Sequence, residues 1–393
     1  MILKVLFFLF LFIILYAYVG YTLLLLILSK FKQLFKYDAR PSSSIPAEPS
    51  VTLLIPAYNE GEYVIEKARN CKDLNYPAQK LHILWVTDGT TDNTAELLLR
   101  YPEFKIIHEK ERRGKIHAMN RGIKQVHTPL VVFTDANTML NSEAIREIVQ
   151  FFSDDKTGCV TGEKRISGTG LQVAVGAGEG LYWQYESWIK RLESDTSSVM
   201  GAVGEIFAVR TALYDEVKED TLLDDFTVSM QIMQKGYSIR YAPKAWGTET
   251  ASLNIQEELK RKTRIAAGGM QALVRMPELL NPFHHGIRSL MYISHKVLRW
   301  TLVPVGFPLL FLLNLMIFCD PVINNKVFTL LFMLQCIFYL FVLAGRILQN
   351  VSLGLRILFA PYYLFIMNFA IIRGFLLFIT GRHTVKWQKV KRS

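Results

Sequence analysis

Cysteine and charge are both scarce in this sequence of 393 residues. The four cysteines lie far apart and form no motif, so the sequence supports neither a disulfide scaffold nor a cysteine metal site. Only 20% of the residues are charged and 51% are hydrophobic, which excludes an intrinsically disordered chain. Such a composition is also unusually apolar for a soluble enzyme, and we expect a membrane protein that carries a soluble domain.

Acidic residues are almost absent from the last third of the chain. Residues 281–393 contain 12 lysines and arginines but one acid, Asp320, whereas residues 1–280 contain 33 residues of each sign. A basic excess raises the question of nucleic acid binding. Here the basic residues are interleaved with long apolar runs, so we expect them to contact the headgroups of a lipid bilayer and predict no nucleic acid partner.

Long apolar runs lie near both ends of the sequence. Residues 5–28 are about 24 consecutive uncharged residues. This run is long enough to cross a hydrocarbon core of ~30 Å and longer than the apolar part of a cleaved signal peptide. Several lysines follow it, and the positive-inside rule then places residue 30 onward in the cytoplasm. Two further spans are predicted at residues 301–319 and 327–345.

A third C-terminal apolar stretch, residues 353–380, is interrupted by Pro361, Asn368 and Arg373. If this stretch crossed the membrane, the basic tail 381–393 would lie outside, against the positive-inside rule. We therefore predict that the stretch is re-entrant or interfacial and that the tail is cytoplasmic. The sequence favours a multi-pass protein of a bacterial inner membrane with its soluble domain in the cytoplasm.

Short apolar runs alternate with amphipathic stretches between these apolar ends. The runs are typical of buried strands, and they cover residues 51–58, 82–89, 104–109 and 130–137. The segments between them have helical periodicity, which predicts an α/β domain with a mostly parallel sheet. The predicted divisions are an N-terminal membrane helix (1–30), a basic and Pro/Ser linker (31–50), the α/β domain (51–284), a C-terminal membrane region (285–380) and a basic tail (381–393).

Four polar clusters occur in a fixed order in this domain. They are IPAYNEGEY (55–63), VTDGTTDNT (86–94), FTDAN (133–137) and LLDDF (222–226). Three of them have an ordinary structural explanation: Asn59 can cap a helix, Asp88 can form an Asp-Gly turn, and the paired acids of LLDDF can begin a helix. Asp135 and Asn137, two residues apart on a predicted strand, share one face and can converge on one ligand. In a parallel sheet, ligands bind beyond the carboxyl ends of the strands, where these clusters lie.

Together, these clusters resemble a membrane-bound family 2 glycosyltransferase with the GT-A fold, of the branch that contains cellulose-synthase-like and poly-N-acetylglucosamine-synthase-like enzymes. The resemblance covers residues 50–270. It implies an inverting transfer of a sugar from a nucleotide-sugar donor, expected to be UDP-linked, to a lipid-linked or growing saccharide acceptor at the cytoplasmic membrane face. It also implies Mg²⁺ or Mn²⁺ to neutralise the leaving diphosphate and a carboxylate base to activate the acceptor.

The resemblance assigns roles residue by residue. The expected nucleotide-binding residues are Ala57, Tyr58, Glu60, Asp88, Lys115 and Asp135. Lys115, in the element RRGKIHAMN, could instead be a solvated charge in a basic loop. Asp135 and Asn137 occupy the place of the family's Asp-x-Asp metal motif, and Asn137 can ligate a hard cation but carries no charge. Asp225 matches the catalytic base, and Asp224 is its helper or a structural acid.

Two further elements concern the acceptor and the diphosphate. The segment GAVGEIFAVR resembles the acceptor side of the family, with Gly201, Gly204 and Glu205 as the expected contacts, or else it is a tight turn into a strand. Polymer-extruding members carry Gln-x-x-Arg-Trp where this chain has RKTRI (261–265). This segment retains positively charged side chains that can bind a diphosphate, namely Arg261, Lys262 and Arg264. An isoleucine replaces the tryptophan that lies under the acceptor sugar, which weakens the case for processive synthesis.

Some alternatives stay open at this point. The aromatic residues Tyr182, Trp183, Tyr185 and Trp188 suit either core and membrane-interface packing or a wall that contacts a sugar or lipid. The substitutions at residues 137 and 265 allow a catalytically weak nucleotide-sugar-binding subunit that supports a partner synthase or transporter. A transporter with a regulatory soluble domain is disfavoured, because the predicted spans contain almost no polar residues. A homo-oligomer would supply additional membrane helices.

Overall fold

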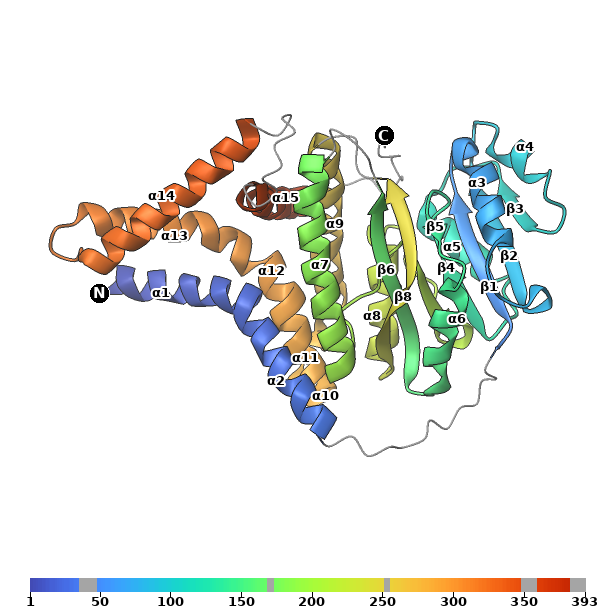
Figure 1. Cartoon of the computed structure of the whole chain (residues 1–393), viewed down its shortest axis with the longest axis horizontal. Helices are drawn as coiled ribbons and strands as arrows, with labels where there is room; N and C mark the ends of the chain where they lie inside the picture. Colours follow the sequence, from blue (N-terminus) through green and yellow to red (C-terminus); the bar gives the residue numbers. More distant parts are fainter. Residues whose placement is uncertain (35–47, 168–172, 251–254, 348–358, 382–393) are drawn as a thin grey trace.

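The computed structural model describes residues 1–34, 48–167, 173–250, 255–347 and 359–381. An α/β domain and a group of apolar helices lie beside each other, and α7 (Val173–Thr196) and α9 (Ile255–Arg275) lie between them (Figure 1). The predicted linker falls partly, and the basic tail almost entirely, outside the described residues. The strand–helix alternation and the flanking apolar helices are as the sequence predicted.

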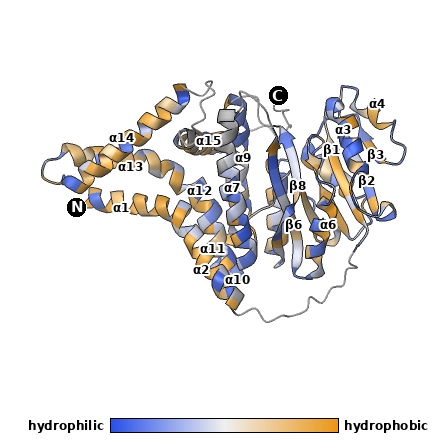
Figure 2. Cartoon of the chain, viewed as in Figure 1, coloured by the Kyte–Doolittle hydropathy of each residue, from blue (hydrophilic) through white to orange (hydrophobic). Residues whose placement is uncertain are grey.

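Four of the helices are long and apolar enough to cross a membrane, and they span residues 2–32, 302–319, 326–347 and 360–379. Figure 2 shows hydrophobic residues along their lengths. The first consists of α1 (Ile2–Leu15), a π-helical turn (Tyr16–Gly20) and α2 (Tyr21–Leu34). The others are α13 (Leu302–Cys319), α14 (Lys326–Ile347) and α15 (Phe359–Ile379). The N-terminal span and the two clear C-terminal spans of the sequence analysis are therefore helices in the structure.

The last helix, α15, is oriented differently from the other three. Figure 1 views α15 almost along its axis, whereas α1, α13 and α14 lie across the view. It packs closely on α9: a Cβ atom on Gly374 would lie 2.5 Å from Ala266 Cβ and 2.7 Å from the carbonyl oxygen of Thr263. This helix therefore runs along the soluble domain, an arrangement that suits an interfacial segment. Its relation to the bilayer stays a prediction.

The first half of the sheet is parallel. Its strands are β1 (Val51–Ala57), β2 (Leu81–Asp88), β3 (Lys105–Glu109) and β4 (Leu130–Phe133), in the order β3-β2-β1-β4. The connecting helices are α3 (Gly61–Lys72), α4 (Thr94–Leu98) and α5 (Lys115–Ile123). Three of the strands coincide closely with the apolar runs of the sequence, but β4 ends at Phe133. The prediction of a strand over 130–137 is therefore wrong in its second half, and Asp135 and Asn137 lie in the loop after β4 instead of on one face of a strand. Leu53 and Leu54 are both fully buried but belong to opposite cores, as expected of a strand covered on both faces.

The second half of the sheet is mixed. It continues with β7 (Phe207–Arg210), β6 (Thr157–Ser167), β8 (Ser238–Thr250) and β5 (Met139–Leu140). The pairs β4–β7, β6–β7 and β5–β8 are antiparallel, and β6–β8 is parallel. The remaining α-helices are α6 (Ala144–Val149), α8 (Asp224–Gln234), α10 (Pro282–His285), α11 (Ile287–Tyr292) and α12 (Leu298–Trp300), and a second π-helical turn covers Ile293–Val297. The predicted fold class, α/β with a mostly parallel sheet and flanking membrane helices, is confirmed.

Candidate active site

A cavity of about 250 Å³, which we call the central cavity, opens beyond the carboxyl end of β4. Its walls come from the loop after β4, the loop before β7, the start of α8 and the cationic face of α9. Most of the residues singled out in the sequence line it. They are Lys115, Asp135, Asn137, Gly201, Gly204, Glu205, Asp224, Asp225, Arg261, Lys262 and Arg264.

Lys115 joins two of the acids in this cavity. Its Nζ lies 2.8 Å from Asp135 Oδ1 and 2.8 Å from Asp224 Oδ2. Burial acts against the charge of Lys115, but the two carboxylates outweigh burial and raise its pKa. The three residues come from the start of α5, the loop after β4 and the start of α8. Lys115 is therefore part of a half-buried ion-pair cluster, and its interpretation as a solvated loop charge is wrong.

Asp224 and Asp225 are adjacent in the chain but differ in their ionisation. Burial and the Asp224 carboxylate raise the pKa of Asp225 to about 7. Burial also acts to raise the pKa of Asp224, but the ion pair with Lys115 outweighs it and holds that pKa below its usual value. One acid is therefore ionised under all ordinary conditions, whereas the other titrates near neutral pH. A carboxylate with a pKa near the working pH is suited to general base catalysis.

The glycines of the segment 201–210 bring its backbone close to Asp225. A Cβ atom on Gly204 would lie 3.3 Å from Asp225 Oδ2. Gly201 has a φ of 103°, and a Cβ atom there would lie 2.4 Å from Cδ2 of Phe226, so only glycine fits. The segment then leads into β7, so it is a tight turn into a strand that also lines the cavity beside the predicted base; its contact with an acceptor stays a prediction.

Asp135 and Asn137 offer one carboxylate and one amide oxygen to a metal ion. Among the described residues, no group of three or more His, Cys, Asp or Glu side chains is placed to hold one. Mg²⁺ is usually bound by one or two carboxylates, substrate phosphates and water rather than by an all-protein cage. The residues present therefore fit a divalent ion that arrives with a diphosphate, but not a permanent metal centre.

The residues predicted for the nucleoside lie at the ends of β1 and β2, outside the lining of the central cavity. Asp88 accepts hydrogen bonds from the backbone amides of Gly114 at 2.6 Å and Arg113 at 3.1 Å. The guanidinium of Arg112 stacks 3.8 Å from the centre of the Tyr58 ring. In this state Asp88 holds the loop that precedes Lys115. Its predicted contact with a base stays a prediction, as do those of Ala57, Tyr58 and Glu60.

The three predicted diphosphate-binding residues on α9 are not equivalent. Arg261 makes a two-pronged ion pair with the buried Glu258, with both nitrogens 3.0 Å from its oxygens. Lys262 lies 3.7 Å from Glu258 and over the rings of Tyr182 and Trp183. Arg264 lines the cavity and forms no ion pair within the described ranges of the chain. The three residues therefore differ in their partners, and their binding of a diphosphate stays a prediction.

Sequence reasoning missed several side chains of the cavity. Glu249 and Lys190 line it, and so does Trp300. Lys164 pairs with both Glu205 and Glu249, and its Nζ lies 2.9 Å from Glu249 Oε2. Glu205, predicted to contact the acceptor, is thus held by a buried lysine. No local motif could have indicated this network, because its members are brought together by the pairing of β6 with β8 and with β7, whose preceding loop carries Glu205.

Aromatic rings reach the central cavity from α7 and α12. Tyr182, Trp183 and Trp300 line it together with Ile265. Of the two interpretations of the aromatic cluster, the cavity wall therefore applies to Tyr182 and Trp183. Contact of these rings with a sugar stays a prediction.

Residues 48–268 match the model of the family described as Glycosyltransferase like family 2. The chain belongs to this family. The matched range contains the whole sheet and every residue predicted for the site. The sequence resemblance to family 2 glycosyltransferases is thus confirmed.

Similar proteins agree with this assignment. Poly-beta-1,6-N-acetyl-D-glucosamine synthase of Staphylococcus aureus (strain COL) is 30% identical over 252 residues, which are 61% of this chain and 60% of the synthase. The synthase of the same name from Staphylococcus epidermidis is 30% identical over 236 residues, 57% of this chain and 56% of its own length. The chain therefore spans about 60% of the length of these curated relatives.

A solved structure shares the fold over nearly the whole chain. Mannosyltransferase PcManGT from Pyrobaculum calidifontis, in complex with GDP-Man and Mn²⁺, superposes with a TM-score of 0.70 at 19% sequence identity. The superposition covers 97% of this chain and 100% of that one, so it includes the membrane helices. It confirms the GT-A fold class predicted from the sequence.

Proposed function

We propose that this protein transfers a sugar, with inversion, from a nucleotide-sugar donor to a hydroxyl of a lipid-linked or growing saccharide at the cytoplasmic face of a bacterial inner membrane. The product would enter a cell-surface polysaccharide or glycolipid. The observation that carries this proposal is the pair Asp224–Asp225 in one cavity: Lys115 keeps the first ionised, and the second has a pKa of about 7. The mannosyltransferase neighbour binds GDP-Man, so GDP-sugars belong in the test beside the expected UDP-sugars.

The reaction needs one proton transfer and one displacement. Asp225 accepts the proton of the acceptor hydroxyl while the hydroxyl oxygen forms a bond to the anomeric carbon of the donor. The bond between this carbon and the diphosphate oxygen breaks, and the nucleoside diphosphate leaves with the electron pair. A single displacement inverts the anomeric centre. Arg264, which lines the same cavity, stabilises the charge of the leaving diphosphate.

A divalent ion belongs in the same proposal. Asp135 and Asn137 would hold Mg²⁺ or Mn²⁺ together with oxygens of the donor diphosphate. The ion would supply further positive charge for the departing group. Lys115 already pairs with Asp135, so the protein itself contributes a cation at this place.

Replacement of Asp225 by asparagine tests the assignment of the base. We expect Asp225→Asn to lower donor turnover by roughly 10² to 10⁴-fold, because general bases contribute rate factors of this size, while donor binding persists. The measurement is nucleotide release by the purified protein from UDP-, GDP- and dTDP-sugars with Mg²⁺ or Mn²⁺, with and without a chelator. Asp215→Asn, at a carboxylate that is 56% exposed and outside the cavity, is the matched control.

Each outcome separates the competing functions. Turnover that is lost in Asp225→Asn and on chelation supports a metal-dependent transferase. Turnover that is unchanged in this variant contradicts the assigned base. A wild-type protein that binds a donor but releases no nucleotide, with any acceptor offered, would favour the binding-subunit alternative that the substitutions at Asn137 and Ile265 allow.

A further inference from the structure

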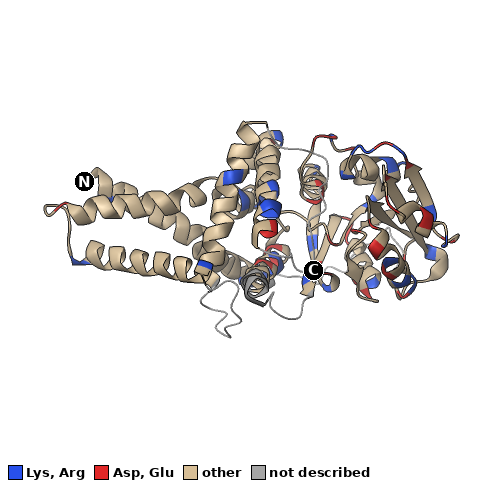
Figure 3. Cartoon of the chain, turned by 90° about the horizontal axis from the view of Figure 1, so that it is seen from above, with Lys and Arg blue, Asp and Glu red and all other residues tan. Residues whose placement is uncertain are grey.

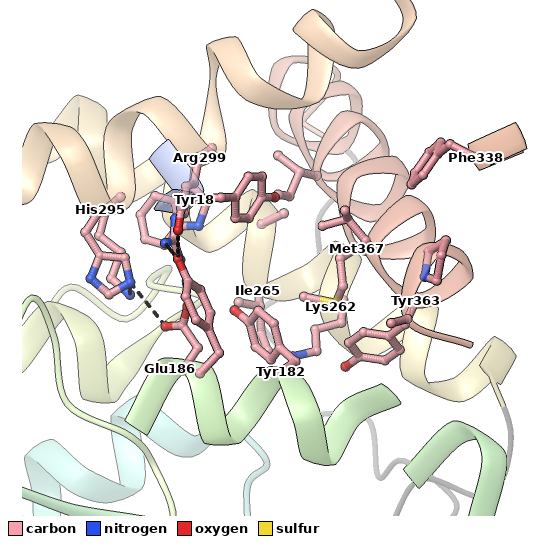
Figure 4. Close-up of a pocket in the computed structure, with 18 residues that line it drawn as sticks. Tyr18, Tyr182, Glu186, Lys262, Ile265, His295, Arg299, Phe338, Tyr363 and Met367 are labelled. Carbon is pink, nitrogen blue, oxygen red and sulfur yellow. Dashed lines mark hydrogen bonds and ion pairs between the residues drawn. The ribbon is translucent and has the colours of Figure 1, made fainter. Parts of the chain in front are cut away.

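A second cavity, of about 460 Å³, lies between the soluble domain and the membrane helices (Figure 4). We call it the membrane-side cavity. Tyr182 of α7 and Lys262 and Ile265 of α9 line it on the side of the soluble domain. On the other side its wall is formed by α14 and α15, with the side chains of Phe338, Ala360, Pro361, Leu364, Met367 and Ile371. Of the described residues that line it from these two helices, Tyr363 alone carries a polar group.

The two cavities adjoin each other and share part of their lining. The residues that line both are Tyr182, Glu186, Lys262, Ile265, Lys296 and Trp300. The ring of Trp300 packs on Phe226, with 5.2 Å between the ring centres, and Phe226 directly follows Asp225. The junction is therefore beside the predicted base. A ligand that occupies both cavities would reach from apolar membrane helices to Asp225.

The charges around the membrane-side cavity are unequal. Lys262, Lys296 and Arg299 line it, against one acid, Glu186. The guanidinium of Arg299 is fully occupied, because it donates to Glu186 Oε1 at 2.7 Å, to the carbonyl oxygen of Ala17 and to the hydroxyl of Tyr185. Arg299 therefore links α12 to α7 and to the N-terminal helix. Two lysines also line the cavity: Lys296, and Lys262, whose Nζ lies 3.7 Å from Glu258 and over the rings of Tyr182 and Trp183.

Lys296 and Lys262 differ in the groups that surround their ammonium nitrogens. Lys296 lies at the junction of the cavities, where its Nζ contacts Nε2 of His295 at 3.3 Å. It pairs with no carboxylate in the described part of the chain. The two acids that lie close by are engaged elsewhere: Glu186 with Arg299, and Glu193 with His295. Burial lowers the pKa of Lys296, so an anion bound beside it would stabilise its charged form.

We propose that the acceptor is a saccharide carried on a lipid phosphate, whose phosphate binds between Lys296 and Lys262. The lipid chain lies in the membrane-side cavity against α14 and α15, and the sugar enters the central cavity and faces Asp225. This inference rests on the proposed function and specifies its acceptor. Phosphate matches the two cations at the junction, and an acyl or isoprenoid chain matches the apolar wall. A polysaccharide strand would find few hydrogen-bonding groups on that wall.

The occupant can be tested by lipid binding, without any transfer reaction. The full-length protein in detergent is titrated with a polyprenyl phosphate and, separately, with the polyprenyl alcohol of the same length, and bound lipid is counted by native mass spectrometry. We expect the phosphate to bind at least tenfold more tightly than the alcohol. Lys296→Gln should lower the affinity for the phosphate roughly tenfold and leave that for the alcohol unchanged, because charge-assisted hydrogen bonds are about twice as strong as neutral ones.

Three further variants make the test specific. Lys296→Arg keeps the charge and should retain binding of the phosphate. Lys326→Gln removes an exposed lysine at the start of α14 and is the control for net charge. Met367→Trp fills the apolar part of the cavity and should weaken the binding of both lipids, which keeps the test informative if Lys296→Gln does not fold.

The lipid-phosphate inference can be wrong while the proposed function is right. Equal binding of phosphate and alcohol, or an unchanged affinity in Lys296→Gln, would overturn the lipid-phosphate inference. Donor turnover that still depends on Asp225 would then leave the transferase in place, with a different acceptor.

Discussion

Lys115 influences the ionisation of the acids that line the central cavity. Lys115 binds Asp135 and Asp224, and it faces Asp225 as well, whose pKa it acts to lower. Burial and Asp224 act on Asp225 in the opposite direction and prevail. Two acids that are neighbours in the chain can therefore serve different purposes, one as a fixed negative charge and one as a base.

The pH dependence of turnover follows from the pKa of Asp225. A base acts only when it is deprotonated, so kcat/KM should fall about tenfold per pH unit below about 7 and level off above it. Lys115→Met removes a cation that lowers this pKa, and its profile should shift to higher pH. Lys124→Met, at a lysine that is 61% exposed, should leave the profile unchanged. The measurement is nucleotide release across a pH series, and a profile that stays flat from acidic to neutral pH would refute Asp225 as the base.

The residues of local motifs could be predicted from the sequence, and those of the surrounding network could not. Asp135, Asp225 and Lys115 follow strands or begin helices within recognisable segments, and all three line one cavity. Lys296 and Glu249 have no such segment, because their positions depend on how the π-helical turn Ile293–Val297 meets α7 and how β8 joins β6. Contacts between distant parts of the chain decide both arrangements.

Close packing between helices joins the soluble domain to the membrane helices. On the N-terminal side, two π-helical turns meet: Tyr16 and Ser294 share a hydrogen bond of 2.8 Å, and Arg299 donates to the carbonyl of Ala17. Such turns free backbone groups for contacts of this kind. On the C-terminal side, α15 lies on α9 through Gly374. The parallel strands were predictable from their apolar runs, whereas these helix contacts depend on shape and have no signature in the sequence.

The contact between α9 and α15 can be tested at Gly374. A valine there would place Cβ 2.5 Å from Ala266 Cβ and force the helices apart, at a cost of roughly 1–3 kcal/mol. We expect Gly374→Val to lower the thermal unfolding temperature in detergent by several degrees. Gly180→Ala, in α7 where a Cβ would meet no atom within 4 Å, should leave this temperature unchanged or raise it slightly. Equal unfolding temperatures for Gly374→Val and the unmodified protein would contradict the packing of α15 on α9.

The distribution of charge over the whole molecule indicates its place in a membrane. Figure 3 shows lysines, arginines and acids gathered over the soluble domain and the adjoining helices, and few on the outer part of the membrane helices. The N-terminal span and the pair α13–α14 would leave both the soluble domain and the end of α14 on the cytoplasmic side. A membrane crossing by α15 would move the chain end to the other side, and an interfacial α15 would not.

Single cysteines in a protein without the four native ones can determine this topology. Val322, 88% exposed between α13 and α14, should react as cysteine with an impermeant maleimide on intact spheroplasts. Leu99, 74% exposed in the soluble domain, should react as cysteine only after permeabilisation. Because α15 lies along the soluble domain and the tail is basic, Ser393→Cys should behave like Leu99→Cys. Reaction of Ser393→Cys on intact spheroplasts would mean that α15 crosses the bilayer. The membrane-side cavity would then be bounded by a spanning helix instead of an interfacial one.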